Sequence, residues 1–378
     1  LLSSWVFLLY IAVNQEDHSA LIESLTLRLK RNEEGFKLIR AENESHRQEA
    51  YNLRQALNHQ TSSQATTNQL DTLTPEDTCR TNKKWLLIGI PTKGRLDSDN
   101  EYQGYLFSTV KRILDELDRE SLSRWKCSLH FFIANFQSRS THHDYQQLRD
   151  EIEASRLSSM FTLQDESTIS IPEVRTHSEA HVDYLYDIDQ PTERVRQQTR
   201  NYTALMKMAL KSVDFDNFMI LEDDFMVCDG FLYHLQHFIS KANRLERDWI
   251  SLRVSYGGNG IIFRKKDLDY VAQYVGAYQY YRPVDHLMIE WALGEAESQE
   301  YKGSRRHLVY RYNLFEHKGI HSTIKAEGRQ GKYPRCFDVI GEPNLSGDRF
   351  DVTRCSTNDF SPCDQTSSFS KFSLVPNQ

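Results

Sequence analysis

The sequence predicts an α/β protein in which a mixed sheet is covered by helices. Short apolar runs of strand length alternate with amphipathic segments of helical length along the middle of the chain. One of these runs ends directly in three adjacent acids, Glu222-Asp223-Asp224, at the kind of position where open α/β sheets bind ligands. With 378 residues, 39% hydrophobic and 11% aromatic, the chain can bury a sizeable core.

The chain opens with an uncharged apolar run, residues 1–13, that ends abruptly at Asn14. A helix of this length rises about 20 Å, short of the ~30 Å hydrocarbon core of a bilayer. Because the first residue is Leu rather than Met, we expect a truncated signal anchor that attaches the chain to a membrane. A cleavable signal core and a buried helix are the alternatives.

A seven-residue repeat of apolar positions follows between Ile22 and Leu57, with charged and amide residues at most other positions. This pattern predicts a coiled-coil stem over residues 14–57, through which the chain could form a homo-oligomer. A single amphipathic helix is the alternative, because polar residues interrupt the repeat. Residues 58–78, rich in Ser, Thr, Gln and Asn, are typical of a flexible linker.

A globular domain is predicted over residues 79–335, followed by a Cys-containing tail over residues 336–378. Its strands are expected at residues 85–90, 128–134 and 218–221, and its helices at residues 105–117, 192–210 and 231–242. Residues 91–95 are predicted to form a turn after the first strand, and Thr192 is a candidate helix N-cap.

Charge and cysteine content exclude some classes of function and favour others. The 46 basic and 53 acidic residues give a net charge of −7, so no nucleic-acid partner is expected. Six cysteines without CxxC spacing favour disulfides in a secretory lumen over a zinc site, with the pairing left open. N-glycosylation sequons at Asn43, Asn201 and Asn344 are compatible with that compartment.

The triplet Glu222-Asp223-Asp224 is the strongest functional signal. Apolar residues flank it on both sides, and adjacent buried carboxylates repel one another unless a cation compensates them. Carboxylate oxygens suit Mg²⁺ and Mn²⁺, so we predict a divalent metal bound around this triplet. Such an ion could neutralise the diphosphate of a nucleotide sugar. A solvent-exposed acidic turn is the alternative.

Sugar transfer to an acceptor hydroxyl would also need a general base. Asp285 and Glu290 are the candidates, because they are the two acids of the apolar stretch 282–291. Asp285 is preferred, and a helix cap after Pro283 is the alternative role for it.

Three further features could contact a nucleotide. Arg196 and Arg200 lie four residues apart on a predicted helix and could clamp a phosphate. His321 follows Gly319 in a predicted loop and could reach a metal or a phosphate. Alternatively, Arg196, Arg200 and His321 lie on the solvated surface and bind no ligand. The glycines of residues 257–260 could let the backbone approach a ligand, or could form a β-turn.

Six short segments occur in a specific order: IGIPTKGR, ERVRQQTRN, LEDD, the glycine-bearing loop before Ile261, RPVDHL and HKGIHS. Together they resemble the α-1,3-mannosyl-glycoprotein 4-β-N-acetylglucosaminyltransferase family, also called N-acetylglucosaminyltransferase IV. The similarity runs from about Leu86 to Ser322, and its specificity comes from the order of the segments rather than from any one of them.

The resemblance implies a GT-A-like fold with a Rossmann-type sheet that binds UDP-GlcNAc and a divalent metal, Mn²⁺ by preference. By this resemblance Asp224 looks like the direct metal ligand, and Asp223 is the second candidate ligand. Glu222 and Asp223 lie nearer the ribose and uridine, and Pro91 and Thr92 border the nucleotide. The family transfers GlcNAc with inversion, in β1,4 linkage, onto the α1,3-arm mannose of glycoprotein N-glycans. Its members are single-pass type II Golgi membrane proteins with a lumenal catalytic domain.

The sequence also departs from the family pattern. The glycine loop is one residue shorter, and Ile289-Glu290 replaces a second acid-histidine pair near Asp285. The tail after Val339 differs from the family's lectin-like C-terminal region. A catalytically inactive member that regulates another Golgi glycosyltransferase through its stem is therefore a second hypothesis. A related transferase with a different donor or acceptor is a third.

Overall fold

The computed structural model describes residues 83–94, 104–119, 125–138, 141–169, 191–295, 297–319, 333–341 and 349–363. The predicted anchor, stem and linker lie outside the described residues, and so does His321. None of the helices in the described ranges combines the length and apolarity that a membrane crossing requires.

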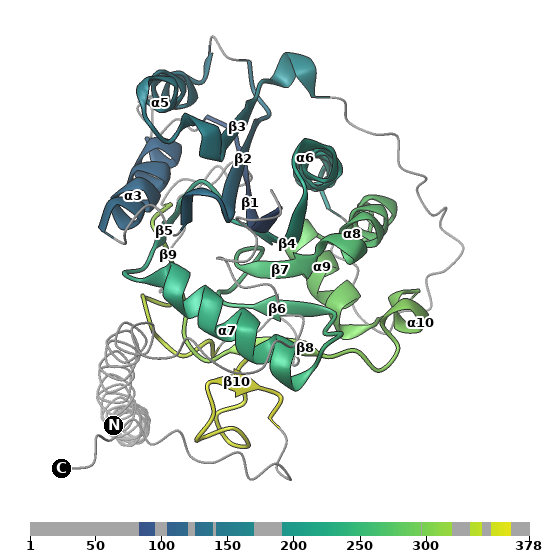
Figure 1. Cartoon of the computed structure of the whole chain (residues 1–378). Helices are drawn as coiled ribbons and strands as arrows, with labels where there is room; N and C mark the ends of the chain where they lie inside the picture. The colour runs from purple at the N-terminus through teal and green to yellow at the C-terminus, as the bar shows by residue number, and fades with distance from the viewer. Residues whose placement is uncertain are drawn as a thin grey trace, which may run out of the picture. The chain divides into compact units, whose positions relative to one another are not determined.

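Strands and helices alternate along the described residues (Figure 1). The strands are β1 (Lys84–Thr92), β2 (Leu129–Asn135), β3 (Phe161–Gln164), β4 (Phe215–Ile220), β5 (Phe225–Val227), β6 (Ser251–Arg253), β7 (Ile261–Arg264), β8 (His307–Tyr310), β9 (Phe315–His317) and β10 (Phe360–Ser361). The helices are α3 (Tyr105–Arg119), α5 (His143–Ala154), α6 (Glu193–Ser212), α7 (Phe231–Leu245), α8 (Lys265–Ala277), α9 (Val284–Leu293) and α10 (Ser298–Lys302), with 3₁₀ turns η2 (Ser158–Met160) and η3 (Glu166–Thr168).

Eight strands form one mixed sheet in the order β10-β8-β6-β7-β4-β1-β2-β3, so the predicted α/β architecture with a mixed sheet is confirmed. Strands β3, β2, β1 and β4 run parallel, whereas β7 pairs antiparallel with β4. The chain runs outward from β1 to β2 and β3, and then returns through α6 to place β4 on the other side of β1. Open α/β sheets bind ligands beyond the carboxyl ends of the strands at such a reversal.

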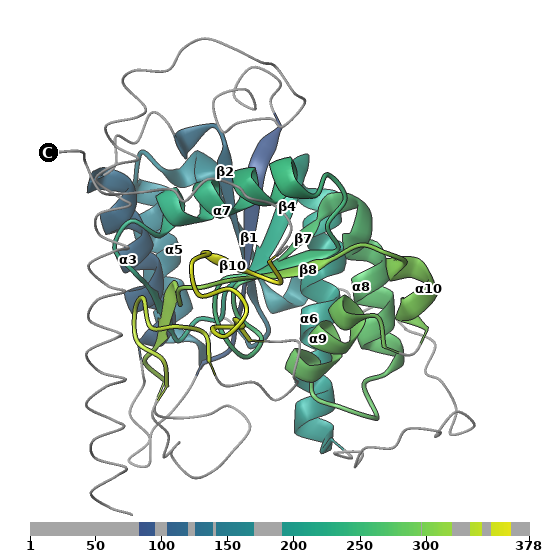
Figure 2. The same ribbon diagram turned by 90° about the horizontal axis from the view of Figure 1, so that it is seen from below.

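Helices cover both faces of the sheet, as Figures 1 and 2 show. Because side chains alternate along a strand, one face packs against α3, α5 and α7 and the other against α6, α8 and α9. Gly89, in the middle of β1, lies beneath α6. A Cβ there would lie 2.6 Å from the ring of Phe218 and 3.3 Å from Leu205. The missing side chain therefore brings α6 close to β1.

The six predicted elements all occur, with boundaries that shift by a few residues. Pro91 and Thr92 were predicted to lie in a turn, but they are the last residues of β1. The reason is that β1 pairs with β2 up to its end, where Pro91 lies opposite Ala134 and Thr92 opposite Asn135. Thr192 occupies the N-cap position of α6 without a capping hydrogen bond from its side chain.

A disulfide, a strand and ion pairs connect the C-terminal residues to the rest of the fold, and a second disulfide lies within them. Cys228 is bonded to Cys336, and Cys355 to Cys363. Cys127 is also disulfide-bonded. Strand β10 joins the same sheet beside β8, and the preceding Asp359 pairs with two basic side chains of α7. The described part of the predicted tail thus extends the sheet of the predicted globular domain.

Candidate functional site

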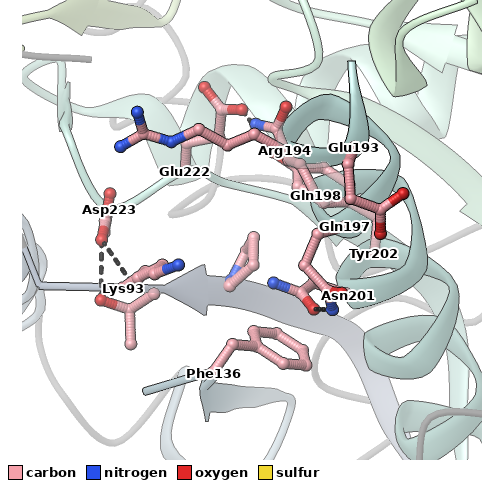
Figure 3. A pocket seen from close by; sticks show the side chains of 12 residues that line it. Lys93, Phe136, Glu193, Arg194, Gln197, Gln198, Asn201, Tyr202, Glu222 and Asp223 are labelled. Atoms are coloured by element: carbon pink, nitrogen blue, oxygen red, sulfur yellow. Dashed lines mark hydrogen bonds between the residues drawn. The ribbon is translucent and has the colours of Figure 1, made fainter. Parts of the chain in front are cut away.

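A pocket of about 390 Å³ lies at the carboxyl ends of β1 and β2, beside the residues that follow β4 (Figure 3). It is lined by Pro91, Thr92, Lys93, Phe136, Glu193, Arg194, Gln197, Gln198, Asn201, Tyr202, Glu222 and Asp223. Four sequence-predicted site residues, Pro91, Thr92, Glu222 and Asp223, are among them. The pocket therefore lies where the reversal in strand order predicts a ligand site.

Glu222 receives hydrogen bonds on both of its carboxylate oxygens. Tyr202, from α6, donates its phenol hydrogen to Oε1, and Asn259 Nδ2 donates to Oε2 at 2.9 Å. Asn259 Oδ1 also accepts the backbone N–H of Glu222 at 2.6 Å. Burial raises the pKa of Tyr202 well above its usual value, and the charge of Glu222 raises it further, so the phenol stays a donor. These contacts hold Glu222 in one position at the pocket wall.

The glycine turn over residues 257–260 positions Asn259. Gly257 and Gly260 have φ angles of +63° and +65°, a left-handed backbone that glycine adopts without strain. Arg253, only 1% exposed, donates to the backbone carbonyl of Ser255 at 2.7 Å and to that of Gly257 at 3.1 Å. Of the two roles predicted for these glycines, the structure shows the tight turn.

Asp223 is buried at 3% exposure and is held from three sides. Its Oδ2 accepts from the Thr92 hydroxyl at 2.7 Å and from the Lys93 N–H at 3.4 Å. Its backbone carbonyl accepts from the Thr109 hydroxyl, on α3, at 2.8 Å. Burial raises the pKa of nearby Asp144 to about 6; a backbone N–H lowers it, and the charge of Asp223 raises it. The site thus carries concentrated negative charge.

Asp224 points toward β9 and is not among the residues that line the pocket. Its Oδ2 lies 3.2 Å from Nε2 of His317, and both side chains are almost fully buried. The pairing of β5 with β9 sets this contact, and the Lys318 N–H donates to the Asp224 carbonyl at 2.9 Å. A Cβ on Gly319 would collide with the Asp224 carboxylate. Residues 317–319 therefore form a tight cradle for this acid.

The two predicted metal ligands have different neighbours. The carboxylate of Asp223 is directed to Thr92, and that of Asp224 to His317. Within the ranges that the structure describes, no group of three or more His, Cys, Asp or Glu side chains is arranged to hold a metal ion. Asp224 and His317 offer two donors, a carboxylate oxygen and an imidazole nitrogen, of the kinds that bind Mn²⁺.

The two candidate bases lie on α9 in different surroundings. Asp285 is half-buried in the first turn of the helix. A Cβ on Gly258 would lie 3.6 Å from Asp285 Cβ and 3.8 Å from Glu222 Oε1, so Asp285 borders the glycine turn next to Glu222. Glu290 is buried, and its Oε1 lies 2.6 Å from Arg282 Nε in an ion pair.

Helix α6 turns one face toward the pocket. Arg194, Gln198 and Asn201 recur at the i, i+4 and i+7 spacing of a single helix face, and they line the pocket together with Gln197. Figure 3 shows Arg194 reaching from the helix across the pocket. Asn201 is also the acceptor of a predicted sequon, so a glycan on it would occupy the pocket.

Arg196 and Arg200, the predicted phosphate clamp, lie on a different face of α6. Both form ion pairs with Glu193. The Arg196 guanidinium lies 4.9 Å from the ring centroid of Tyr280, and Arg200 Nη1 donates to Gln279 Oε1 at 2.9 Å. Neither arginine is among the pocket-lining residues, whereas their neighbour Arg194 is.

Several residues of the site were not predicted from the sequence. Arg194 could have been found, because its helical spacing to Asn201 separates it from the other arginines of α6. His317 belongs to the HKGIHS segment, but its contact with Asp224 depends on the pairing of β5 with β9. Tyr202 and Asn259 have no local signal, because each is a polar residue inside an ordinary helix or turn.

Among solved structures, the fold is similar to the crystal structure of S. aureus TarS, with a TM-score of 0.33 and 9% identity over 62% of this chain and 37% of that chain. A second structure, of S. aureus TarS 1-349, matches with a TM-score of 0.31 and 10% identity over 61% of this chain and 59% of that one. This chain therefore spans less than two thirds of the length of either. No family model and no curated protein matches the sequence. At these values the likeness is distant and does not extend to function.

Proposed function

We propose that this chain is a glycosyltransferase that binds a nucleotide sugar in the pocket at the carboxyl ends of β1 and β2, beside the residues that follow β4. The position of the pocket carries the proposal: it lies at the reversal in strand order and is lined by Thr92, at the end of β1, and by Glu222 and Asp223, which follow β4. Nucleotide sites of open α/β sheets occupy this position. The mixed sheet also agrees with the GT-A-like fold that the sequence resemblance implies.

The chemistry of the pocket wall suits a nucleoside diphosphate. The amides of Gln197, Gln198 and Asn201 each offer donors and an acceptor, which the polar edge of uracil and the ribose hydroxyls require. Phe136 offers an aromatic ring on which a base can stack. Arg194 carries a planar cation that matches phosphate oxygens. It would take the phosphate-binding role that the sequence predicted for Arg196 and Arg200.

A divalent metal, Mn²⁺ in this proposal, would be held by Asp224 with His317 as a second ligand. Both donors fit this ion, and Gly319 lacks the side chain that would displace the Asp224 carboxylate. When bound, the ion would stabilise the negative charge of the diphosphate leaving group. Asp223, predicted as a second metal ligand, accepts from Thr92 in the pocket wall and would contact the nucleotide with Glu222.

Asp285 is the proposed general base. The acceptor hydroxyl oxygen attacks C1 of the donor sugar while the bond from C1 to the diphosphate oxygen breaks. The nucleoside diphosphate leaves with the electron pair, Asp285 takes the hydroxyl proton, and attack from the opposite face inverts the anomeric centre. Glu290 is the weaker candidate, because its ion pair with Arg282 occupies the carboxylate.

The finer assignment rests on the sequence resemblance. In this proposal the donor is UDP-GlcNAc, the acceptor is the α1,3-arm mannose of a glycoprotein N-glycan, and the new linkage is β1,4. The Golgi lumen as the location, the membrane anchor and association of copies through the stem belong to the same proposal.

The test is to incubate the purified chain with UDP-GlcNAc, Mn²⁺ and a panel of N-glycan acceptors, and to measure UDP release and product mass. A product heavier by one GlcNAc supports the proposal. Binding of UDP without transfer to any acceptor favours the inactive, regulatory family member, and transfer only from another donor favours a related transferase. Absence of both binding and product refutes the glycosyltransferase assignment.

Asp224→Ala sharpens this test. It should lower metal-dependent UDP binding and turnover about a hundredfold or more, because it removes a charge-stabilising group from the site. Asp150→Ala, on the exposed side of α5, is the matched control and should change neither. Full Mn²⁺-dependent turnover in Asp224→Ala would overturn the ligand assignment.

A further inference from the structure

We propose that His142 is a positioning residue that acts through Thr92 to hold the carboxylate of Asp223 in the pocket. The inference rests on the proposed function, because Asp223 is the acid expected to meet the nucleotide. The three residues come from three elements: Thr92 ends β1, His142 precedes α5, and Asp223 follows β4. Their contacts therefore connect the start of α5 to two residues that line the pocket, Thr92 and Asp223.

The geometry sets the direction of each hydrogen bond. His142 is the N-cap of α5, and its Nδ1 accepts the backbone N–H of Tyr145 at 3.3 Å. An imidazole that accepts at Nδ1 is neutral and carries its hydrogen on Nε2. This Nε2 lies 2.9 Å from Thr92 Oγ1, so His142 donates to Thr92. The hydroxyl hydrogen of Thr92 is then directed to Asp223 Oδ2, at 2.7 Å.

The whole chain of hydrogen bonds is shielded from water. Thr92 and His142 are each 2% exposed, and Asp223 is 3% exposed. In such surroundings successive hydrogen bonds polarise one another, and a broken bond leaves a buried polar group unsatisfied. The N-terminus of α5 therefore orients the imidazole, the imidazole orients the hydroxyl, and the hydroxyl sets the rotamer of Asp223 before a ligand arrives. Pre-organisation of this kind lowers the cost of binding.

A purely structural role for His142 would be to cap α5, and the two roles use different ring nitrogens. Nδ1 serves the cap, whereas Nε2 serves Thr92. His142→Asn keeps an acceptor near the position of Nδ1 but has no group at Nε2. His142→Gln reaches the position of Nε2 with an amide N–H but has no acceptor for the cap. The pair of variants thus separates positioning from capping.

The experiment measures UDP affinity of the full chain by calorimetry with Mn²⁺ present. Thr92→Val should weaken binding about tenfold, the size expected for one lost hydrogen bond to a charged group. Thr92→Ser, which keeps the hydroxyl, should recover most of that loss. His142→Asn should bind UDP more weakly than His142→Gln, although the Gln variant loses the helix cap and melts at a lower temperature. The reverse order of affinity, or wild-type affinity in Thr92→Val, overturns the proposal.

Failure of the proposed function would give a different result, namely a wild-type chain that does not bind UDP at all. Two readouts then test the relay without a ligand. Proton–nitrogen NMR of the imidazole should show the hydrogen of His142 on Nε2, and an Nδ1–H tautomer would contradict the relay. A crystal structure of Thr92→Val should show the Asp223 carboxylate rotated from its position in the wild type, and an unmoved carboxylate would also contradict it.

Discussion

A single methyl group added at Gly319 should remove metal-dependent activity without unfolding the chain. A Cβ built on Gly319 collides with Asp224 Oδ2 and also lies 2.9 Å from Cγ and 3.0 Å from Cβ of the same side chain. Because three successive atoms are too close, turning the terminal oxygens alone does not relieve the contact. The whole carboxyl group of Asp224 must leave its position in Gly319→Ala.

The structure allows an estimate of both effects. The backbone of Asp224 is held by the Lys318 N–H at 2.9 Å and its side chain is buried, so the side chain has little room to move. Overpacking of this kind costs about 1–3 kcal/mol of stability. The displaced carboxylate also loses its 3.2 Å contact with His317. Loss of a charge-stabilising group from an active site typically lowers kcat about 100–1,000-fold, so activity should fall far more than stability.

The assay is GlcNAc transfer across a Mn²⁺ titration, together with a thermal melt of each variant. Gly319→Ala should turn over about a hundredfold more slowly at saturating Mn²⁺, with Tm lower by several degrees. Gly104→Ala is the control, because its new Cβ would lie at an ordinary 3.5 Å from Asp144 Oδ1. Wild-type turnover and wild-type Mn²⁺ dependence in Gly319→Ala would refute the assignment of Asp224 as the metal ligand.

Three further predictions concern pH, glycosylation and the pocket wall. Burial lowers the pKa of His130 to about 4 and that of His307 to about 3, so the unfolded chain binds more protons than the folded chain as the pH falls from 6.5 toward 4. The two histidines therefore lower the free energy of unfolding as the pH falls. Asp144, with its pKa raised to about 6, has the opposite effect below that pH. Urea melts at pH 4.5 should show a free energy of unfolding lower than at pH 7 by a net amount on the order of 1–3 kcal/mol. Peptide mapping of the chain expressed through the secretory pathway should find Asn201 unmodified, because it lies inside α6 and lines the pocket; a glycan on the UDP-binding form would contradict this placement. Tyr202→Phe should lower stability by about 1–3 kcal/mol and weaken UDP binding, since it removes a buried donor to Glu222; unchanged melts and affinity would show that this hydrogen bond contributes nothing.

The local elements were predictable from the sequence because their signals are local. Apolar runs of strand length and helical periodicity place β1, β2, β4, α3, α6 and α7 within a few residues of their observed bounds. The acids after β4 were recognised for the same reason, since three adjacent carboxylates between apolar residues form a pattern of consecutive positions. The conclusion that Pro91 and Thr92 border the site came from the resemblance, and both line the pocket.

The tertiary structure decided everything that depends on which segments become neighbours. Asp223 and Thr92 are 131 residues apart in the sequence, yet they are joined by a hydrogen bond because β4 lies beside β1. The contact between Asp224 and His317 depends in the same way on the pairing of β5 with β9. Helix α6 carries several arginines, and its packing over Gly89 turns Arg194, rather than Arg196 or Arg200, to the pocket. Sequence spacing defines the faces of a helix and the ends of a strand, whereas strand order and packing determine which face and which end meet at a site.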